Sequence, residues 1–332
     1  MRSWSWLGLG LCAALVGCGG DDGGGLLDGF AGSGGSQPSA AGAGSGGQAA
    51  AGSGGSEQAG SGGTAASSDK LKMSIIARAV PVGGQEHVCV VVELPNSAPI
   101  WVDRIDAVLS GGSHHLIVDR KPAGTALNSE PMVCAPTMAS DASRLIIAQQ
   151  AKTAVTLPSG VAFKLEAHQR MFMQLHYLNV SDAAHDIRGD VELSVVSSSA
   201  KQPIEAKNIF TGSTNITVPA HADSESSAYF MPMAGRGMRH VFGLTSHTHR
   251  LGVRSTIERV ASANAPSATP LHESSSWSEP PLTFFDPPLQ FDGSDGLRLI
   301  CRYHNDTDQA VHFGVEAQDE MCFMWLYYYD EP

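Results

Sequence analysis

Short runs rich in β-branched and aromatic residues recur from residue 87 to the end of the chain, and they constrain the fold more than any other feature. Clusters of Gly, Pro, Asn and Asp separate the runs, and apolar residues rarely recur at helical spacing. This pattern is typical of antiparallel β-sandwiches. We expect strands at His87–Leu94, His115–Asp119, Met171–Leu178, Asp190–Val196, Val241–Leu244, Leu297–Tyr303 and Met324–Tyr329.

Residues 19–68 are too poor in large apolar side chains to join such a core. They hold 19 of the 37 glycines, and beyond residue 22 their only charged residues are Asp28 and Glu57. Because this composition cannot bury enough apolar surface to offset the entropy lost on ordering, it predicts a flexible tether. The remaining 264 residues, 69–332, are enough for one large β domain or two smaller ones.

Two polar stretches interrupt the body of the chain. Ser197–Pro203 separates two strand-rich halves, so we place a domain boundary near residue 200. This predicts an all-β protein with two antiparallel β-sandwich domains, 69–200 and 201–332. Residues 262–284 are rich in Ser, Pro and Ala and predict one long loop.

Charge and missing motifs exclude several function classes. A net charge of −12 without any basic run argues against a nucleic-acid partner. The sequence has no Gly-x-Ser-x-Gly elbow, no phosphate-binding glycine loop and no His-Glu-x-x-His motif. A serine hydrolase, a nucleotide-binding enzyme and a zincin protease are therefore disfavoured.

The N-terminus has the features of an export signal. Arg2 precedes an apolar run, Trp4–Val16, that is too short to span a bilayer. The run ends in Leu15-Val16-Gly17-Cys18, which resembles the lipobox of bacterial lipoproteins. The alternative is an ordinary signal with an incidental cysteine.

The lipobox resemblance implies an envelope location. It divides the N-terminus into a signal peptide, residues 1–17, and a tether, residues 18–68, that begins with the lipidated Cys18. Gly19 stands where that family's retention signal has an aspartate, so the implied anchor is the outer membrane of a bacterial cell envelope.

Four cysteines remain once the signal is removed and Cys18 is lipidated. An even number in an oxidising compartment suggests two disulfides, and three pairings are possible. The local pairing would close a loop within each half of the body. The four residues are Cys89, Cys134, Cys301 and Cys322.

The 13 histidines form clusters that suggest metal binding. In a strand, residues i and i+2 face the same side, so His247 and His249 would present two imidazoles together, a natural metal chelate. An exposed polar strand face is the competing interpretation. The adjacent pair His114 and His115 needs a strand end or bulge to share a metal, and Gly111-Gly112 precedes it. A pair at a loop edge is the alternative there.

Two further residues can complete such sites. His176 lies in an apolar run, where a lone histidine is more often a satisfied core residue than a ligand. Met321, in Asp319-Glu320-Met321-Cys322, is either packing or a soft thioether ligand, and a thioether ligand selects copper(I).

In order along the chain, these motifs resemble the copper type II, ascorbate-dependent monooxygenases, which include the peptidylglycine α-hydroxylating and dopamine β-monooxygenases. The pieces are His-His, Gln-Leu-His-Tyr, His-Thr-His-Arg-Leu-Gly, Cys-Arg-Tyr and Asp-Glu-Met-Cys. The resemblance covers most of residues 75–332. It implies two jelly-roll β-sandwiches with two copper ions facing each other across a solvent-filled cleft.

The resemblance also implies ligands and a reaction. His114, His115 and His176 would bind the electron-storing copper, and the catalytic copper would bind to the set His247, His249 and Met321. Cys301 with Cys322, and Cys89 with Cys134, match disulfides of the family. The implied reaction inserts one atom of O2 into an activated C–H bond and takes electrons from ascorbate or another one-electron reductant.

The resemblance breaks down at the substrate. Thr245 stands where the peptide-amidating branch has an arginine, and Phe323 and Trp325 replace its asparagine and tyrosine. Because a buried carboxylate without a cation is unfavourable, peptidylglycine is disfavoured and an uncharged or aromatic small molecule or peptide is expected. The alternatives to a monooxygenase are a non-catalytic copper-binding surface lipoprotein of the same fold and an adhesion sandwich without copper.

Overall fold

The computed structural model describes residues 70–136, 144–196, 201–234, 237–316 and 318–331. Within these ranges the chain is all-β, as predicted, and contains no helix. No described segment is a helix long and apolar enough to cross a membrane. The predicted signal peptide, Cys18 and the tether lie outside the described residues, as do residues 197–200 at the predicted domain boundary.

Eleven strands precede residue 206 and form two sheets. They are β1 (Lys70–Val80), β2 (Gln85–Glu93), β3 (Ile100–Leu109), β4 (Ser113–Lys121), β5 (Asn128–Val133), β6 (Arg144–Ala148), β7 (Lys152–Thr156), β8 (Val161–Leu165), β9 (Arg170–Leu178), β10 (His185–Val195) and β11 (Ile204–Glu205). One sheet has the order β1-β10-β3-β8-β11, with β7 also on β3, and the other is β5-β2-β9-β4-β6. Side chains from both sheets share one hydrophobic cluster, so the two sheets pack against each other.

Eleven further strands complete the chain. They are β12 (Lys207–Ser213), β13 (Thr217–Val218), β14 (Ala222–Glu225), β15 (Tyr229–Pro232), β16 (Arg239–His247), β17 (Gly252–Val260), β18 (Pro270–Ser274), β19 (Thr283–Phe291), β20 (Gly296–Asn305), β21 (Val311–His312) and β22 (Cys322–Asp330). They form the sheets β12-β22-β16-β19 and β14-β20-β17-β18, with β15 also on β20, and the pair β13-β21. Among the described strands, pairs are antiparallel apart from the short β8–β11 pair.

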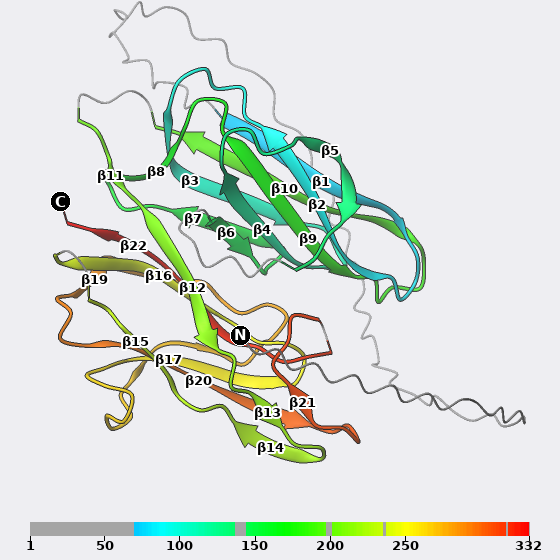
Figure 1. Cartoon of the computed structure of the whole chain (residues 1–332), viewed down its shortest axis with the longest axis vertical. Coiled ribbons are helices and arrows are strands. Elements are labelled where there is room, and N and C mark those ends of the chain that lie inside the picture. The colour runs from blue at the N-terminus through cyan, green and yellow to red at the C-terminus, as the bar shows by residue number, and fades with distance from the viewer. Residues whose placement is uncertain (1–69, 137–143, 197–200, 235–236, 317, 332) are drawn as a thin grey trace, which may run out of the picture. The chain divides into compact units, whose positions relative to one another are not determined.

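The last strand, β22, is buried on both faces, which explains its run of aromatic residues. Alternate side chains Phe323, Trp325 and Tyr327 join the cluster shared with the first half of the chain. Met324 and Leu326 point the other way, into a second cluster with β20 and β16. Figure 1 shows β22 beside β16 and β12. A two-residue period with both faces apolar is expected of a strand placed between two cores.

The predicted strands are confirmed, each lying within or almost within an observed strand. The predicted long loop at 262–284 is wrong in part, because it contains β18 and the first residues of β19. β18 pairs with β17 and turns the polar side chains of His272 and Ser274 inward. Such a strand lacks the apolar alternation by which strands are recognised in a sequence.

Both disulfides of the local pairing are present. Cys89 is bonded to Cys134 and Cys301 to Cys322, with Cα–Cα separations of 6.0 and 5.8 Å. The first bond joins the β2 strand to the segment after β5, and the second joins β20 to β22. Cys89 lies on β2, which pairs with the His176 strand β9, and Cys322 directly follows Met321. Each disulfide therefore lies near a predicted ligand set.

Candidate metal centre

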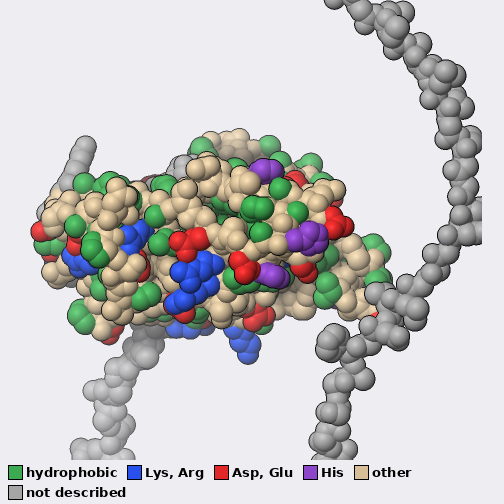
Figure 2. Space-filling model, turned by 90° about the horizontal axis from the view of Figure 1, so that it is seen from below, with side chains coloured by type: hydrophobic (Ala, Val, Ile, Leu, Met, Phe, Trp, Pro, Cys, Tyr) green, Lys and Arg blue, Asp and Glu red, His purple; other side chains and the backbone are tan. Residues whose placement is uncertain are grey.

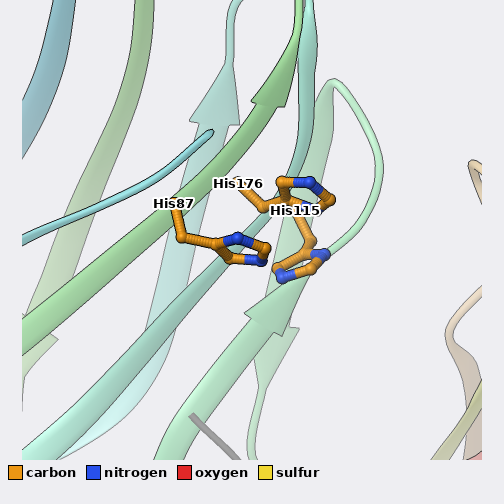
Figure 3. A group of neighbouring side chains, drawn as sticks. All are labelled: His87, His115 and His176. Carbon is orange, nitrogen blue, oxygen red and sulfur yellow. The ribbon is translucent and has the colours of Figure 1, made fainter. Parts of the chain in front are cut away.

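Three neighbouring strands place a row of histidines on one face of the sheet β5-β2-β9-β4-β6. In the register, His176 on β9 lies opposite His87 on β2 and opposite His115 on β4. One nitrogen from each of the three rings lies within 4.8 Å of the other two. Figure 3 shows the three side chains reaching toward one another from their strands. The set can hold a metal ion, and it contains two of the three residues predicted for the first copper.

His114, the third predicted residue, lies at an irregularity next to this row. The register between β4 and β9 shifts between Ser113 and His115, which confirms the predicted bulge. Gly112, with φ of +86°, adopts the left-handed conformation in the Gly111-Gly112 turn that precedes β4. The His114 ring centre lies 5.1 Å from that of His115 and 5.2 Å from that of His176. Adjacent residues can therefore approach the same site.

Burial keeps these imidazoles neutral, the form that binds metals. It lowers the pKa of His87 and His114 to about 4 and that of His176 to about 2, and it holds the pKa of His115 well below its usual value. Both ring nitrogens of His176 and Nδ1 of His115 are buried without a hydrogen-bond partner. Such buried donors and acceptors are unfavourable unless something binds them, and an imidazole-bound copper fits this donor set.

His247 and His249 lie close together, as the His-x-His spacing predicts, with ring centres 5.3 Å apart. His247 is the last residue of β16, and His249 follows in the turn before β17. The Nδ1 atom of His247 is 2.6 Å from Oε1 of Gln149, and Nδ1 of His249 is 3.0 Å from the carbonyl oxygen of Asp319. Each imidazole can donate through Nδ1 to these acceptors, which leaves Nε2 with its lone pair for a metal.

Glu320 ties Met321 to this pair. Its carboxylate accepts backbone N–H bonds from His249, Leu251 and Met321 at 3.1, 2.7 and 3.2 Å. Burial raises the pKa of Glu320 to about 7 despite these three donors. The Tyr303 hydroxyl donates to the Met321 carbonyl at 3.0 Å. The buried carboxylate thus fixes the turn after the His-x-His pair and the residue before Cys322 in one arrangement.

The two predicted ligand sets lie next to each other. The His247 ring centre is 5.6 Å from that of His115 and 6.1 Å from that of His114. The structure thus differs from the expected solvent-filled cleft between the sets, because rings from the two sets are in contact. Gln149, which follows β6, contributes by binding His247 and by donating to the Ser246 carbonyl at 3.3 Å.

A pocket of about 480 Å³ opens beside the histidines. His114 and His176 line it from one ligand set and His249 from the other. The remaining wall combines apolar side chains with an exposed arginine at position 250; it includes Leu178, Val180, Trp277, Gln85 and Gln318. The Trp277 ring centre lies 5.2 Å from that of His114. A small molecule in this pocket would touch residues of both sets.

The three predicted substrate-pocket residues, Thr245, Phe323 and Trp325, are buried and do not line this pocket. Phe323 stacks on Phe210 with ring centres 4.9 Å apart. The guanidinium of Arg144 lies 5.5 Å from the Trp325 ring centre, and its Nε is 3.7 Å from a carboxylate oxygen of Asp119. A buried cation therefore does lie beside Trp325, neutralised by a buried acid.

Several histidines outside the two ligand sets lie on the surface. His221 and His304 are exposed and pair with the aspartates Asp308 and Asp223. Figure 2 shows a face on which single histidines lie among acidic and basic side chains. Clustering with other imidazoles thus distinguishes the site histidines, since His272 is also buried but bonds to the hydroxyls of Ser246 and Thr283.

Sequence reasoning missed His87, Gln149 and Glu320 as parts of the site. His87 stands in the first predicted strand, two residues before Cys89, where only its spacing from His176 in the folded sheet makes it significant. Gln149 and Glu320 act through hydrogen bonds to residues 98 and 71 positions away. No local pattern marks such contacts.

The clustered, buried imidazoles beside the pocket form a donor set that can hold metal ions. Residues 201–332 match the family described as copper type II ascorbate-dependent monooxygenase, C-terminal domain. The chain is also 25% identical, over 193 residues, to peptidylglycine alpha-amidating monooxygenase of Rattus norvegicus, a match that covers 53% of this chain and 18% of that protein. Both comparisons thus give the chain a similarity to copper type II ascorbate-dependent monooxygenases, and the family match lies in its C-terminal part.

The matches cover different shares of the two chains compared. The chain spans less than a fifth of the length of the rat relative. Among solved structures it aligns with the crystal structure of PBCV-1 VP54 fitted into a cryo-EM reconstruction of the virophage Sputnik, at 8% identity and a TM-score of 0.30, over 79% of this chain and 94% of that one.

Proposed function

We propose that this protein is a copper-dependent monooxygenase that hydroxylates an activated C–H bond with O2 and electrons from an external reductant such as ascorbate. The observation that carries the proposal is the pocket lined by His114 and His176 on one side and by His249 on the other. Copper held by such residues supplies one-electron redox chemistry and reaction with O2. The match of residues 201–332 to the copper type II ascorbate-dependent monooxygenase family supports the same reaction class.

Two copper ions are proposed, one for each ligand set. His114, His115 and His176 hold the first, and His247, His249 and Met321 hold the second. The surrounding residues prepare the second set, because Gln149 and the Asp319 carbonyl fix the two imidazole tautomers. Glu320 fixes the backbone of His249 relative to Met321. The two β-sandwich domains of this enzyme are proposed at 69–200 and 201–332, except that β11 (Ile204–Glu205) completes a sheet of the first domain.

The proposed substrate is an uncharged or aromatic molecule. Leu178, Val180 and Trp277 offer it an apolar wall. Arg144 does not present a charge to the pocket, because its side chain is fully buried and ion-paired with Asp119. Arg250 is exposed to solvent. An ion pair between its guanidinium and a substrate carboxylate would be solvated and would contribute little binding free energy. Peptidylglycine, the substrate in the name of the rat relative, is therefore not proposed here.

The proposed location is the outer membrane of a bacterial envelope. Lipidation of Cys18 after removal of residues 1–17 would anchor the chain, and the tether 18–68 would let the enzyme reach away from the surface. Two disulfides fit an oxidising compartment.

The first test is the copper content of the full chain after reconstitution and dialysis against a weak chelator. We expect two copper ions per chain, and one in the double variant His247→Ala/His249→Ala. The matched control His221→Ala/His304→Ala removes two exposed histidines and should keep both ions. A wild-type chain without bound copper would contradict the proposal.

The second test separates the enzyme from the alternative, a non-catalytic copper-binding lipoprotein. With ascorbate and a small aromatic substrate that has a benzylic C–H bond, the enzyme should consume O2 in proportion to hydroxylated product. Met321→Ile should reduce this turnover while the first copper stays bound. Full copper loading without substrate-dependent O2 consumption, over aromatic and glycine-extended peptide substrates, would favour the alternative.

A further inference from the structure

A fourth histidine belongs to the first copper site. We propose that His87 is a ligand of the copper that His115 and His176 bind, an inference that rests on the proposed copper function. His87 is not one of the residues that the family motifs of this sequence select, which are His114, His115 and His176. His87 nevertheless lies beside these histidines, because its strand β2 pairs with the His176 strand β9.

The register of three strands brings the ligands together. β9 is paired with β2 on one side and with β4 on the other, so His87 and His115 flank His176. The three are at most 7% exposed, and one nitrogen of each lies within 4.8 Å of the others. Around an ion with bonds of about 2.0 Å, ligand nitrogens are about 3.3 Å apart, so small side-chain rotations close the set.

The unpartnered nitrogens of the row point to an ion. Nδ1 of His115 and both ring nitrogens of His176 lack any hydrogen-bond partner and are inaccessible to water. Two buried imidazoles without partners would be unfavourable as a purely structural feature. Stacked imidazoles alone satisfy none of these atoms, whereas an ion bound between the rings takes one nitrogen of each ring.

One side-chain movement must accompany binding. The rings of His87 and His176 are stacked, with centres 3.9 Å apart and planes within 11°. Because an ion lies near the plane of each imidazole that binds it, two parallel rings cannot share one ion. A turn of the His87 ring about its Cβ–Cγ bond resolves this. The backbone is held meanwhile, since the Cys134 N–H donates to the His87 carbonyl at 3.0 Å.

This assignment gives His114 a distinct position. His114 lines the pocket, whereas His87 and His115 do not. With His87, His115 and His176 as the inner ligands, His114 is the fourth imidazole and faces the pocket. The first copper would then have four imidazoles available rather than three.

The test uses the full chain with His247→Ala/His249→Ala, so that only the first site can bind. Copper(I) affinity is measured by competition with a chromophoric chelator, and the number of imidazoles is measured by X-ray absorption. His87→Phe is compared with this background, because phenylalanine keeps the ring stack but cannot bind copper. His304→Phe, at an exposed position, is the matched control.

If His87 is a ligand, His87→Phe should raise the copper(I) Kd by at least about 100-fold, since changing a residue that only supports a ligand already costs about 10–100-fold. The imidazole count should fall by one, with His304→Phe unchanged. A Kd within about threefold of the background and an unchanged imidazole count would overturn the inference and leave the proposed function standing. A background protein and a wild-type chain that bind no copper would overturn both. Circular dichroism shows whether His87→Phe is folded, and His87→Gln, which cannot stack, repeats the test if it is not.

Discussion

The histidines of the site are held neutral by withdrawal from water. Burial is the main cause of the lowered pKa at each of them, and neighbouring imidazoles lower several further. A protonated imidazole cannot bind a metal, so this environment keeps the ligands ready near neutral pH. The same burial makes folding of the apoprotein sensitive to acid.

His272, which belongs to neither ligand set, allows the acid sensitivity of the folded state to be measured at a single residue. Its nitrogens bond the hydroxyls of Ser246 and Thr283 at 3.0 and 2.9 Å, and burial lowers its pKa from 6.5 to about 4. The unfolded chain therefore binds a proton more readily than the folded one, so its contribution is full above pH 6.5 and is lost as pH falls toward 4. We expect a loss of about 3 kcal/mol over this range, and a smaller loss in His272→Gln.

The measurement is urea unfolding of the copper-free protein at pH 7 and pH 4.5. The other buried histidines contribute equally to wild type and variant, so their difference isolates His272. The exposed-site control His304→Gln should follow the wild type. An equal pH dependence in wild type and His272→Gln would refute the assignment.

Glu320 is the residue on which the second ligand set depends for its geometry. Glu320→Ala leaves the buried N–H groups of His249, Leu251 and Met321 without their acceptor. We expect unfolding free energy to fall by about 3 kcal/mol, because each orphaned buried donor is unfavourable by about 1–3 kcal/mol when water cannot reach it. Chemical denaturation and copper titration measure the two effects. Glu316→Ala, exposed in the same loop, should change neither.

Among the secondary-structure elements, the strand β22 connects the second ligand set to both hydrophobic clusters. It is buried on both faces, pairs with β12 and β16, and begins at the disulfide cysteine that follows Met321. Its register places Thr245 opposite Trp325 and His247 opposite Phe323. The second ligand set is thus built on paired strands rather than on a free loop.

The Cys301–Cys322 disulfide should stabilise this arrangement. The bond joins residues 21 positions apart, and closing a loop of this length in the unfolded chain corresponds to about 3 kcal/mol. We expect Cys301→Ala/Cys322→Ala to lower the unfolding free energy by about this amount and to weaken copper binding at the second set. Cys89→Ala/Cys134→Ala, with a separation of 45, should destabilise slightly more but act on the first set. The reverse pattern of copper loss would contradict this division.

For the whole molecule, the two halves of the chain share structure at the site. Phe210, Phe242 and Trp325 join the hydrophobic cluster of the first half. Gln149 from the first half bonds His247 from the second. The pocket likewise takes its wall from both halves. Ligand sets from residues 87–176 and 247–321 therefore meet only in the complete fold.

Deletion of residues 19–68 should leave that fold and its copper intact. The described residues that form the pocket and the ligand sets all lie beyond residue 84, and the composition of 19–68 predicts a tether without a function beyond reach. We expect the same copper content and the same urea midpoint for the deleted and full chains. Loss of bound copper on deletion would show that the segment contributes to the site.

The sequence by itself determined the all-β class, the positions of seven strands and the motif histidines. These follow from a two-residue period, turn residues and short spacings, which act within a few residues of one another. It did not reveal β18, whose inward side chains are polar, or the cation of Arg144 beside Trp325.

Only the tertiary structure decided which of these residues meet. His87 reaches His176 across a strand pair, Gln149 reaches His247, and Glu320 reaches His249, over separations of 89, 98 and 71 residues. Register, sheet packing and burial create such contacts, and they depend on the whole arrangement of strands rather than on any local pattern. The types of ligand residue could therefore be predicted from the sequence, whereas the fold decides which of these residues form each site.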